Sequence, residues 1–217
     1  MLRHIHRFFS GNSYHEKLES LKPLINSPYP SPNITAFFAL GAAPVFLGGL
    51  STALFPHINL FTTIINDIAL YTCLYSTIHT SFLAGIHLGF SSVLYDPLLG
   101  NNDSRYIKLQ MIYPFFAPIM TSAFCYVYWV TPYSNINALY SISGIAFTYL
   151  GIYAGDYYYA VNRKTIPMWY KRLKLKITVS SVAGLILVLY GVFMFPELTK
   201  PKTQTFARPS SQIILDN

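Results

Sequence analysis

Two histidines are the side chains with the clearest chemical potential inside an apolar segment. His79 and His87 are eight residues apart in a run from 68 to 95 that contains no Asp, Glu, Lys or Arg. On a helix they would point about 80° apart. A haem clamp needs axial ligands from facing helices, and a metal site would want carboxylates at the same depth. Neither is evident, so a hydrogen bond to a neighbouring helix is the favoured role for each.

Two acids are the nearest ionisable groups to the apolar segments. Intramembrane acids mark functional sites by default. Asp67 and Asp156, however, lie near predicted segment ends, where helix capping explains them. The sequence has no Ser-His-Asp spacing and no glycine loop for phosphate. We therefore expect no enzymatic activity, no metal and no cofactor apart from bound phospholipid such as cardiolipin. Cys73 and Cys125 are expected to be buried apolar residues.

Composition places these residues in a membrane. Of 217 residues, 53% are hydrophobic and only 11% are charged, against about 25% charged in a soluble domain. Charge-free runs cover 68–95, 109–155 and 177–196, and about 20 apolar residues cross the hydrocarbon core. The net charge of +7 lies beside these runs, which favours anionic lipid over nucleic acid as a partner. The predicted class is an all-α polytopic membrane protein.

The pattern predicts a bundle of about five transmembrane helices. The segments are 35–55, 67–95, 107–130, 136–158 and 177–196. Asn66 and Asp67 are the expected N-cap of the second, and Pro44, Pro114 and Pro118 should bend the first and third. The predicted organisation is a basic segment at 1–34, a membrane domain at 35–196 and a polar tail at 197–217.

Flanking charge predicts the orientation. With five spans, twelve Lys and Arg residues fall on the side of the N-terminus and three on the other side. The positive-inside rule then puts the N-terminus inside and the C-terminus outside. The first ten residues are basic and contain no acid, a composition typical of mitochondrial targeting. The expected location is the inner membrane, with the N-terminus in the matrix and the C-terminus in the intermembrane space.

Small residues at a spacing of four predict helix packing. They let helix backbones approach closely, and the sequence places them at Thr77, Ser81, Gly85 and Gly89 and again at Gly151 and Gly155.

A basic aromatic segment between the last two spans predicts a lipid site. Trp and Tyr favour the headgroup layer, and clustered cations bind cardiolipin headgroups. The residues are Trp169, Tyr170, Lys171, Arg172, Lys174 and Lys176. Topological anchoring alone is the alternative.

Three stretches of the sequence resemble the transmembrane protein 69 family of multi-pass proteins, which carries a domain of unknown function. Leu40-Gly41-Ala42-Ala43-Pro44 is similar to a first-span motif of that family, Gly-Ala-x-Pro. Tyr75 with 81–89 resembles a Tyr…Ser-Phe-Leu-x-Gly-x-x-Trp-Gly segment, with Leu88 in place of Trp. Asp156 with 167–178 resembles an Asp…Pro-x-Trp-Tyr-x-x-Leu-Arg…Thr segment, with Lys174 in place of Arg. The resemblance implies a five-span mitochondrial inner-membrane protein and supplies no reaction.

Three functions are compatible with these patterns. The first is a non-catalytic accessory or structural subunit of an inner-membrane assembly, most plausibly a respiratory-chain complex with cytochrome c oxidase as first choice. It would bind other membrane subunits and anionic lipid through its helices. The second is a small inner-membrane transporter or channel, favoured by the prolines. A haem-handling or assembly protein is the third.

Overall fold

A computed structural model describes residues 29–58, 62–94, 101–130, 134–162 and 166–199, and within them the chain is helical. There are five long helices: α3 (Pro32–Leu54), α4 (Thr62–Leu94), α5 (Asn101–Val130), α6 (Asn135–Val161) and α7 (Met168–Met194). Two short ones, η1 (Phe55–Ile58) and α8 (Pro196–Thr199), follow α3 and α7. No strand occurs in this part of the chain. The predicted all-α bundle is therefore confirmed.

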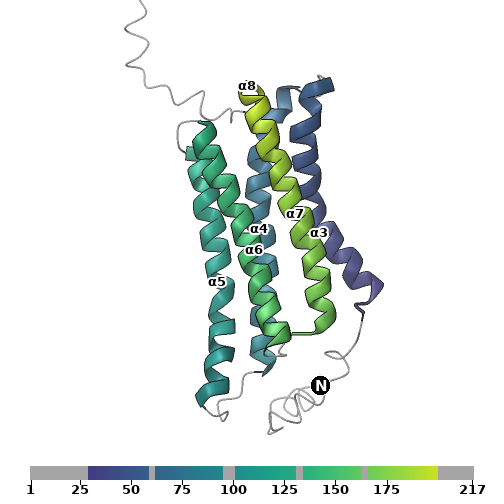
Figure 1. Ribbon diagram of the computed structural model, residues 1–217, viewed down its shortest axis with the longest axis vertical. Coiled ribbons are helices and arrows are strands. Elements are labelled where there is room, and N and C mark those ends of the chain that lie inside the picture. Colours follow the sequence, from purple (N-terminus) through teal and green to yellow (C-terminus); the bar gives the residue numbers. More distant parts are fainter. Residues whose placement is uncertain (1–28, 59–61, 95–100, 131–133, 163–165, 200–217) are drawn as a thin grey trace, which may run out of the picture.

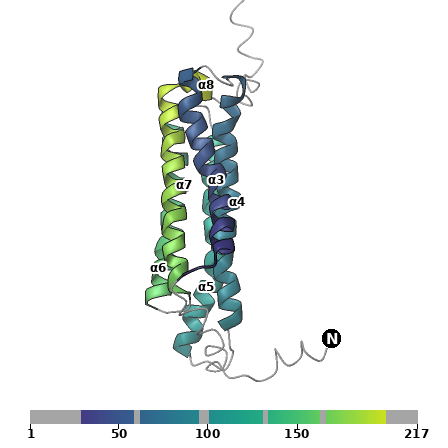
Figure 2. The same cartoon turned by 90° about the vertical axis from the view of Figure 1, so that its right-hand side faces the viewer.

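The long helices run alternately up and down and form a closed ring (Figures 1 and 2). Around the ring, α3 packs on α4, α4 on α5, α5 on α6, α6 on α7, and α7 on α3, while α4 also touches α6 across the middle. Because the number of long helices is odd, α3 begins and α7 ends at opposite ends of the bundle (Figure 1).

The outside of the bundle is apolar. Large hydrophobic side chains on every long helix are more than half exposed, among them Phe37, Ile78, Phe115, Phe147 and Ile186. An apolar surface of this extent requires an apolar surrounding. Four regions are long and apolar enough to cross a membrane: Pro32–Ile58, Arg105–Val130, Asn135–Val161 and Met168–Met194. The chain is thus a multi-pass membrane protein.

Helix α4 is as long as its neighbours but is not among these four regions. Its buried face carries Thr, Ser and His side chains. It packs against each of the other four long helices. Its polar side chains therefore face the inside of the bundle, where protein surrounds them.

Local signals explain most helix boundaries. Ser31 caps α3 by accepting a hydrogen bond from the Ile34 amide, and Pro32 follows at the first helical position. Ser134 caps α6 in the same way, accepting from the Asn137 amide. Pro44 lies inside α3, whose first turns lean away from the bundle in Figure 1, as expected where proline removes a backbone donor.

Two predicted boundaries are wrong. Helix α4 begins at Thr62, so Asn66 and Asp67 lie within the helix and do not cap it. Helix α7 begins at Met168, nine residues before the predicted start. Its first three turns have one buried and one exposed face, and the cations on this segment made it resemble a loop. Residues 1–28 and 200–217, which hold most of the predicted terminal segments, lie outside the described residues.

The closest helix contact is a glycine seam between α3 and α7. A Cβ added to Gly49 would collide with the Gly184 backbone, and one added to Gly184 would collide with the backbone of Val45 and Phe46. Gly191 meets Thr52 in the same way. These glycines let the two backbones touch.

The predicted packing ladders are largely wrong for contacts within this chain. Among the described residues, nothing lies within 4 Å of a Cβ built on Gly85, Gly89 or Gly151. Of the glycines in the ladders, Gly155 alone meets a described neighbour, the Tyr113 ring. The two glycines of the α4 ladder thus have no described neighbour, whereas Thr77 at the start of the ladder lies beside Cys125 of α5.

Candidate functional site: a buried ionic triad

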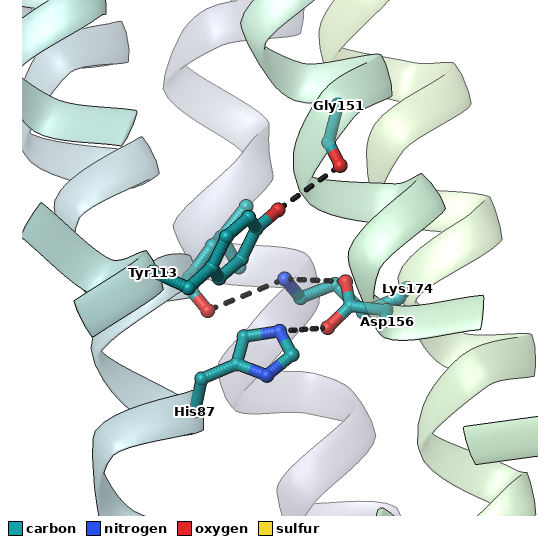
Figure 3. A network of polar contacts seen from close by, with 6 residues as sticks. His87, Tyr113, Gly151, Asp156 and Lys174 are labelled. Carbon is teal, nitrogen blue, oxygen red and sulfur yellow. Dashed lines mark hydrogen bonds and ion pairs between the residues drawn. The ribbon is translucent and has the colours of Figure 1, made fainter. Parts of the chain in front are cut away.

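Three ionisable side chains meet inside the bundle. The Asp156 carboxylate on α6 lies 2.7 Å from His87 Nε2 on α4 and 3.1 Å from Lys174 Nζ on α7. Lys174 Nζ also donates to the Leu83 carbonyl at 3.4 Å. All three side chains have zero exposure. Figure 3 shows His87 and Lys174 converging on Asp156 from two helices; we call this group the triad.

Helical periodicity brings the three residues to the centre. On α6 the buried positions Tyr149, Ile152, Asp156 and Tyr159 recur every three or four residues, which places them on one face. On α7, Lys174 shares such a face with Thr178 and Ser181. Asp156 is five residues from the end of α6, and Lys174 is six from the start of α7. The triad therefore lies about 8–9 Å inside the bundle at that end.

Tyrosines enclose the triad. The Tyr113 ring lies edge-on to His87 with ring centroids 4.9 Å apart, and its hydroxyl donates to the Gly151 carbonyl at 3.0 Å. The Tyr159 ring is 5.6 Å from the His87 ring. On the other side, Lys174 Nζ is 5.4 Å from the centre of the Tyr170 ring. These rings separate the charges from the surroundings.

The charges balance when His87 is neutral. An ammonium and a carboxylate cancel, and a neutral imidazole can donate its Nε2 proton to Asp156. His87 Nδ1 then has no hydrogen-bond partner among the described residues, although it is buried. The triad thus has one vacant proton acceptor in direct contact with its ion pair.

A second polar contact joins α4 and α6 farther from the connection between α6 and α7. His79 Nδ1 on α4 is 2.9 Å from the Tyr149 hydroxyl on α6, and both side chains are buried. Each of these contacts pairs a histidine of α4 with a residue of α6. We refer to His79–Tyr149 as the upper rung and to His87–Asp156 as the lower rung.

Buried polar side chains continue along the bundle interior. On α4 they are Thr72, Ser76, His79, Thr80, His87 and Ser91; on the other helices they include Gln110, Thr121, Ser141, Tyr149, Asp156, Lys174, Thr178 and Ser181. From Thr72 to Ser91 the stripe extends about 28 Å along α4. This length approaches the hydrocarbon thickness of about 30 Å.

An apolar groove lies on the lipid side of the triad. It has a volume of about 350 Å³ and runs between α5 and α6, where Phe116, Phe124 and Phe147 line it. Tyr113 and Gly151 also line it, and their hydrogen bond closes the groove at the triad. Tyr113 is therefore the wall between the groove and His87.

The residues predicted as a lipid site separate into two groups. Trp169, Tyr170 and Lys174 are buried, and Lys174 points to Asp156 instead of the headgroup layer. Arg172 and Lys176 are exposed, and Lys171 is half-buried with its ammonium 4.2 Å from the centre of the Tyr157 ring. Binding of lipid headgroups by these three cations stays a prediction.

The expectation that helix capping explains Asp156 is wrong, because its carboxylate pairs with His87 and Lys174 inside the bundle. The expectation for both histidines is confirmed, since each contacts α6. Cys73 and Cys125 are free and buried, as expected. Within the described residues, no three His, Cys, Asp or Glu side chains lie close enough to share a metal ion.

One sequence signal could have revealed the ion pair. Asp156 and Lys174 are at nearly equal distances from the connection between α6 and α7, which spans 162–167. In an antiparallel helical hairpin, such positions lie side by side. A predicted hairpin with opposite charges at matching depth therefore indicates a buried pair. The predicted later start of α7 hid this match.

The comparisons with known proteins leave the chain without a relative from which a function could be taken. No family model, curated protein sequence or solved structure matches it. The similarity to the transmembrane protein 69 family accordingly stays a sequence-based expectation.

Proposed function

We propose that this protein is a small transporter that moves protons across its membrane, with Asp156 as the group that binds and releases them. The triad carries the proposal. Three fully buried ionisable groups inside a membrane bundle are costly, and such groups mark ion and proton pathways. The buried polar stripe supports it, because it extends over most of the membrane thickness.

Protonation of Asp156 would alter the packing of three helices. As a carboxylate, Asp156 holds His87 on α4 and Lys174 on α7. A neutral carboxyl group no longer balances the Lys174 charge, so the attraction between α6 and α7 falls. Proton binding is thereby coupled to helix packing, which a transporter requires in order to open alternately to its two sides.

Prolines give two helices the freedom to change shape. Pro114 and Pro118 lie inside α5 and Pro44 lies inside α3. Each proline removes one backbone hydrogen bond and weakens the helix locally. Pro114 is next to Tyr113, so a change in the bend of α5 would move the wall of the triad.

Proton flux into liposomes tests the proposal. Purified protein is reconstituted with a pH-sensitive dye inside, and a potassium diffusion potential drives protons inward. Wild-type protein is expected to speed acidification over protein-free liposomes. Asp156→Asn, which keeps shape but cannot carry the proton, should reduce that rate at least about tenfold.

The matched control is Lys108→Met, which removes an exposed cation from α5 and should leave flux unchanged. Wild-type flux equal to that of empty liposomes, under both directions of the potential, would refute proton transport.

A second function is favoured by a different observation. On the face of α4 that carries Thr77, Ser81, Gly85 and Gly89, neither glycine has a neighbour among the described residues. A helix of another subunit could pack there closely. This supports an accessory subunit of a mitochondrial inner-membrane assembly, with a respiratory-chain complex such as cytochrome c oxidase as the leading candidate.

Native electrophoresis of mitochondria in mild detergent tests the subunit function. The wild-type chain should migrate with a large complex, and Gly85→Leu should release it while the isolated chain keeps its stability. Migration of the wild type solely as a small species would exclude this function.

The location and lipid partners belong to the same set of proposals. The N-terminus would face the matrix, the C-terminus the intermembrane space, and Lys171, Arg172 and Lys176 would bind cardiolipin. Protease protection in mitoplasts tests the orientation. Lipid analysis of protein in which Lys171, Arg172 and Lys176 are all changed to Gln tests the binding. An unchanged amount of bound cardiolipin would exclude a specific site.

A further inference from the structure

The upper rung is a buried pair of titratable groups that the triad does not use. His79 is 3% exposed and Tyr149 is 0% exposed, and one hydrogen bond of 2.9 Å joins them. His79 uses its Nδ1 for this bond, and its Nε2 has no hydrogen-bond partner among the described residues. A Cβ built on Gly41 of α3 would lie 3.6 Å from this nitrogen. The ring thus has one bonded and one vacant nitrogen.

The two rungs have the same spacing on three helices. His79 and His87 are eight residues apart on α4, and Tyr149 and Asp156 are seven apart on α6. On α7, Ser181 lies beside the Tyr149 hydroxyl and is seven residues from Lys174. Each separation corresponds to two helical turns, or about 10–12 Å.

Helix α7 supplies the polar side chain between the rungs. Thr178 is buried at 2% exposure and shares a face with Lys174 and Ser181. The corresponding levels of α4 and α6 hold the apolar residues Leu83, Ala84 and Ile152. A polar connection between the rungs therefore follows α7.

The groups around the upper rung limit what can influence its charge. Among the described residues, Tyr75 and Cys73 of α4 and Lys174 of α7 are the ionisable groups that face it. Helix α3 presents Gly41, and α5 faces the other side of α4, where Thr121 contacts Thr80. Lys174 is the charged member, and it also belongs to the triad.

We propose that His79 and Tyr149 form a second proton site, which exchanges protons with the triad along Thr178 and Ser181 and is occupied in alternation with Asp156. When Asp156 holds a proton, the Lys174 charge is uncompensated and repels a proton on His79. When Asp156 is ionised, it cancels that charge and His79 can accept one. This inference rests on the proposed proton transport and specifies its path.

Each transfer conserves protons without a further reactant. Tyr149 gives its hydroxyl proton to His79 Nδ1 and regains one from the side where Ser76 and Ser181 lie. The reverse transfers return the proton from His79 Nδ1 through the Tyr149 hydroxyl to that side. No bond other than O–H and N–H bonds is made or broken.

Titration of His79 tests the link without any need for flux. Nitrogen-15 signals of labelled histidine follow the ring, and His79→Gln assigns the signal. Lys174→Met leaves the Asp156 carboxylate without its ammonium partner, and this negative charge should tighten proton binding by His79. Asp156→Asn leaves the Lys174 ammonium unpaired and should weaken it. At a separation near 10 Å each change is about tenfold. Thr121→Val, a polar-to-apolar change outside the path, should have no effect.

Shifts in the same direction, or no shift in either variant, would overturn the link between the sites.

Flux supplies the second test. Thr178→Val and His79→Gln should each slow proton entry by at least tenfold while thermal stability stays near that of the wild type. If Asp156→Asn abolishes flux and these two variants do not change it, the path is wrong and proton transport stands. If the wild type carries no flux, proton transport fails, and the histidine titration still decides the link.

Discussion

Removal of the Asp156–Lys174 pair as a unit should cost far less stability than removal of either charge alone. The nitrogen and oxygen atoms are 3.1 Å apart with no exposure. At an effective dielectric constant of about 20, their attraction is about 5 kcal/mol. Asp156→Asn or Lys174→Met leaves a single buried charge, which typically costs about 3–5 kcal/mol. The double variant has no buried charge of this pair, so its stability should be within about 2 kcal/mol of wild type.

Thermal unfolding in detergent measures the effect. Trp169 packs on Tyr170 with ring centroids 6.1 Å apart, close to the triad, and reports on local packing by fluorescence. A loss of 3–5 kcal/mol corresponds to a fall in Tm of roughly 6–20 °C for a chain of this size. Lys108→Met serves as the exposed control and should change stability by at most about 0.5 kcal/mol.

The double variant distinguishes a coupled pair from two independent residues. Additive losses would place it below both single variants, at roughly 6–10 kcal/mol less than wild type. That result would refute the ion pair as the reason for burying these groups. Recovery to near the wild-type Tm would support it.

Two further outcomes follow from particular contacts. Gly184→Val should destabilise the bundle by about 1–3 kcal/mol because its side chain meets the α3 backbone. Gly85→Val should be nearly neutral, so equal losses of Tm for the two variants in detergent would contradict the close contact between α3 and α7. Tyr113→Phe should cost about 1 kcal/mol through the lost bond to the Gly151 carbonyl, and no Tm change would mean that this bond contributes nothing.

Much of the architecture was predictable because it depends on local sequence. Apolar segments predicted the five long helices, whereas the one predicted cap, Asn66 with Asp67, was wrong because α4 begins at Thr62. The boundary of α7 was not predictable from charge alone. Its first turns carry four cations, yet the helix buries Trp169, Tyr170 and Lys174 on one face. A helix can turn exposed cations to one face and buried side chains to the opposite face, so charges within a segment do not mark it as a loop.

Spacing rules identified small-residue faces but not their neighbours. The ladder on α4 has the pattern of a packing face, yet the close contact in this chain lies between α3 and α7 at Gly49 and Gly184. Both patterns are compatible with packing. Which face meets which helix depends on the arrangement of the whole bundle.

The sequence by itself determined that this chain is a helical membrane protein, because solvent preference is a property of each segment's own side chains. Only the tertiary structure decided that Asp156, His87 and Lys174 meet. They are up to 87 residues apart along the chain, and each one alone is compatible with a cap, a hydrogen bond or a surface cation. Their chemistry arises from distances of about 3 Å, and such distances between different helices exist only in the packed bundle.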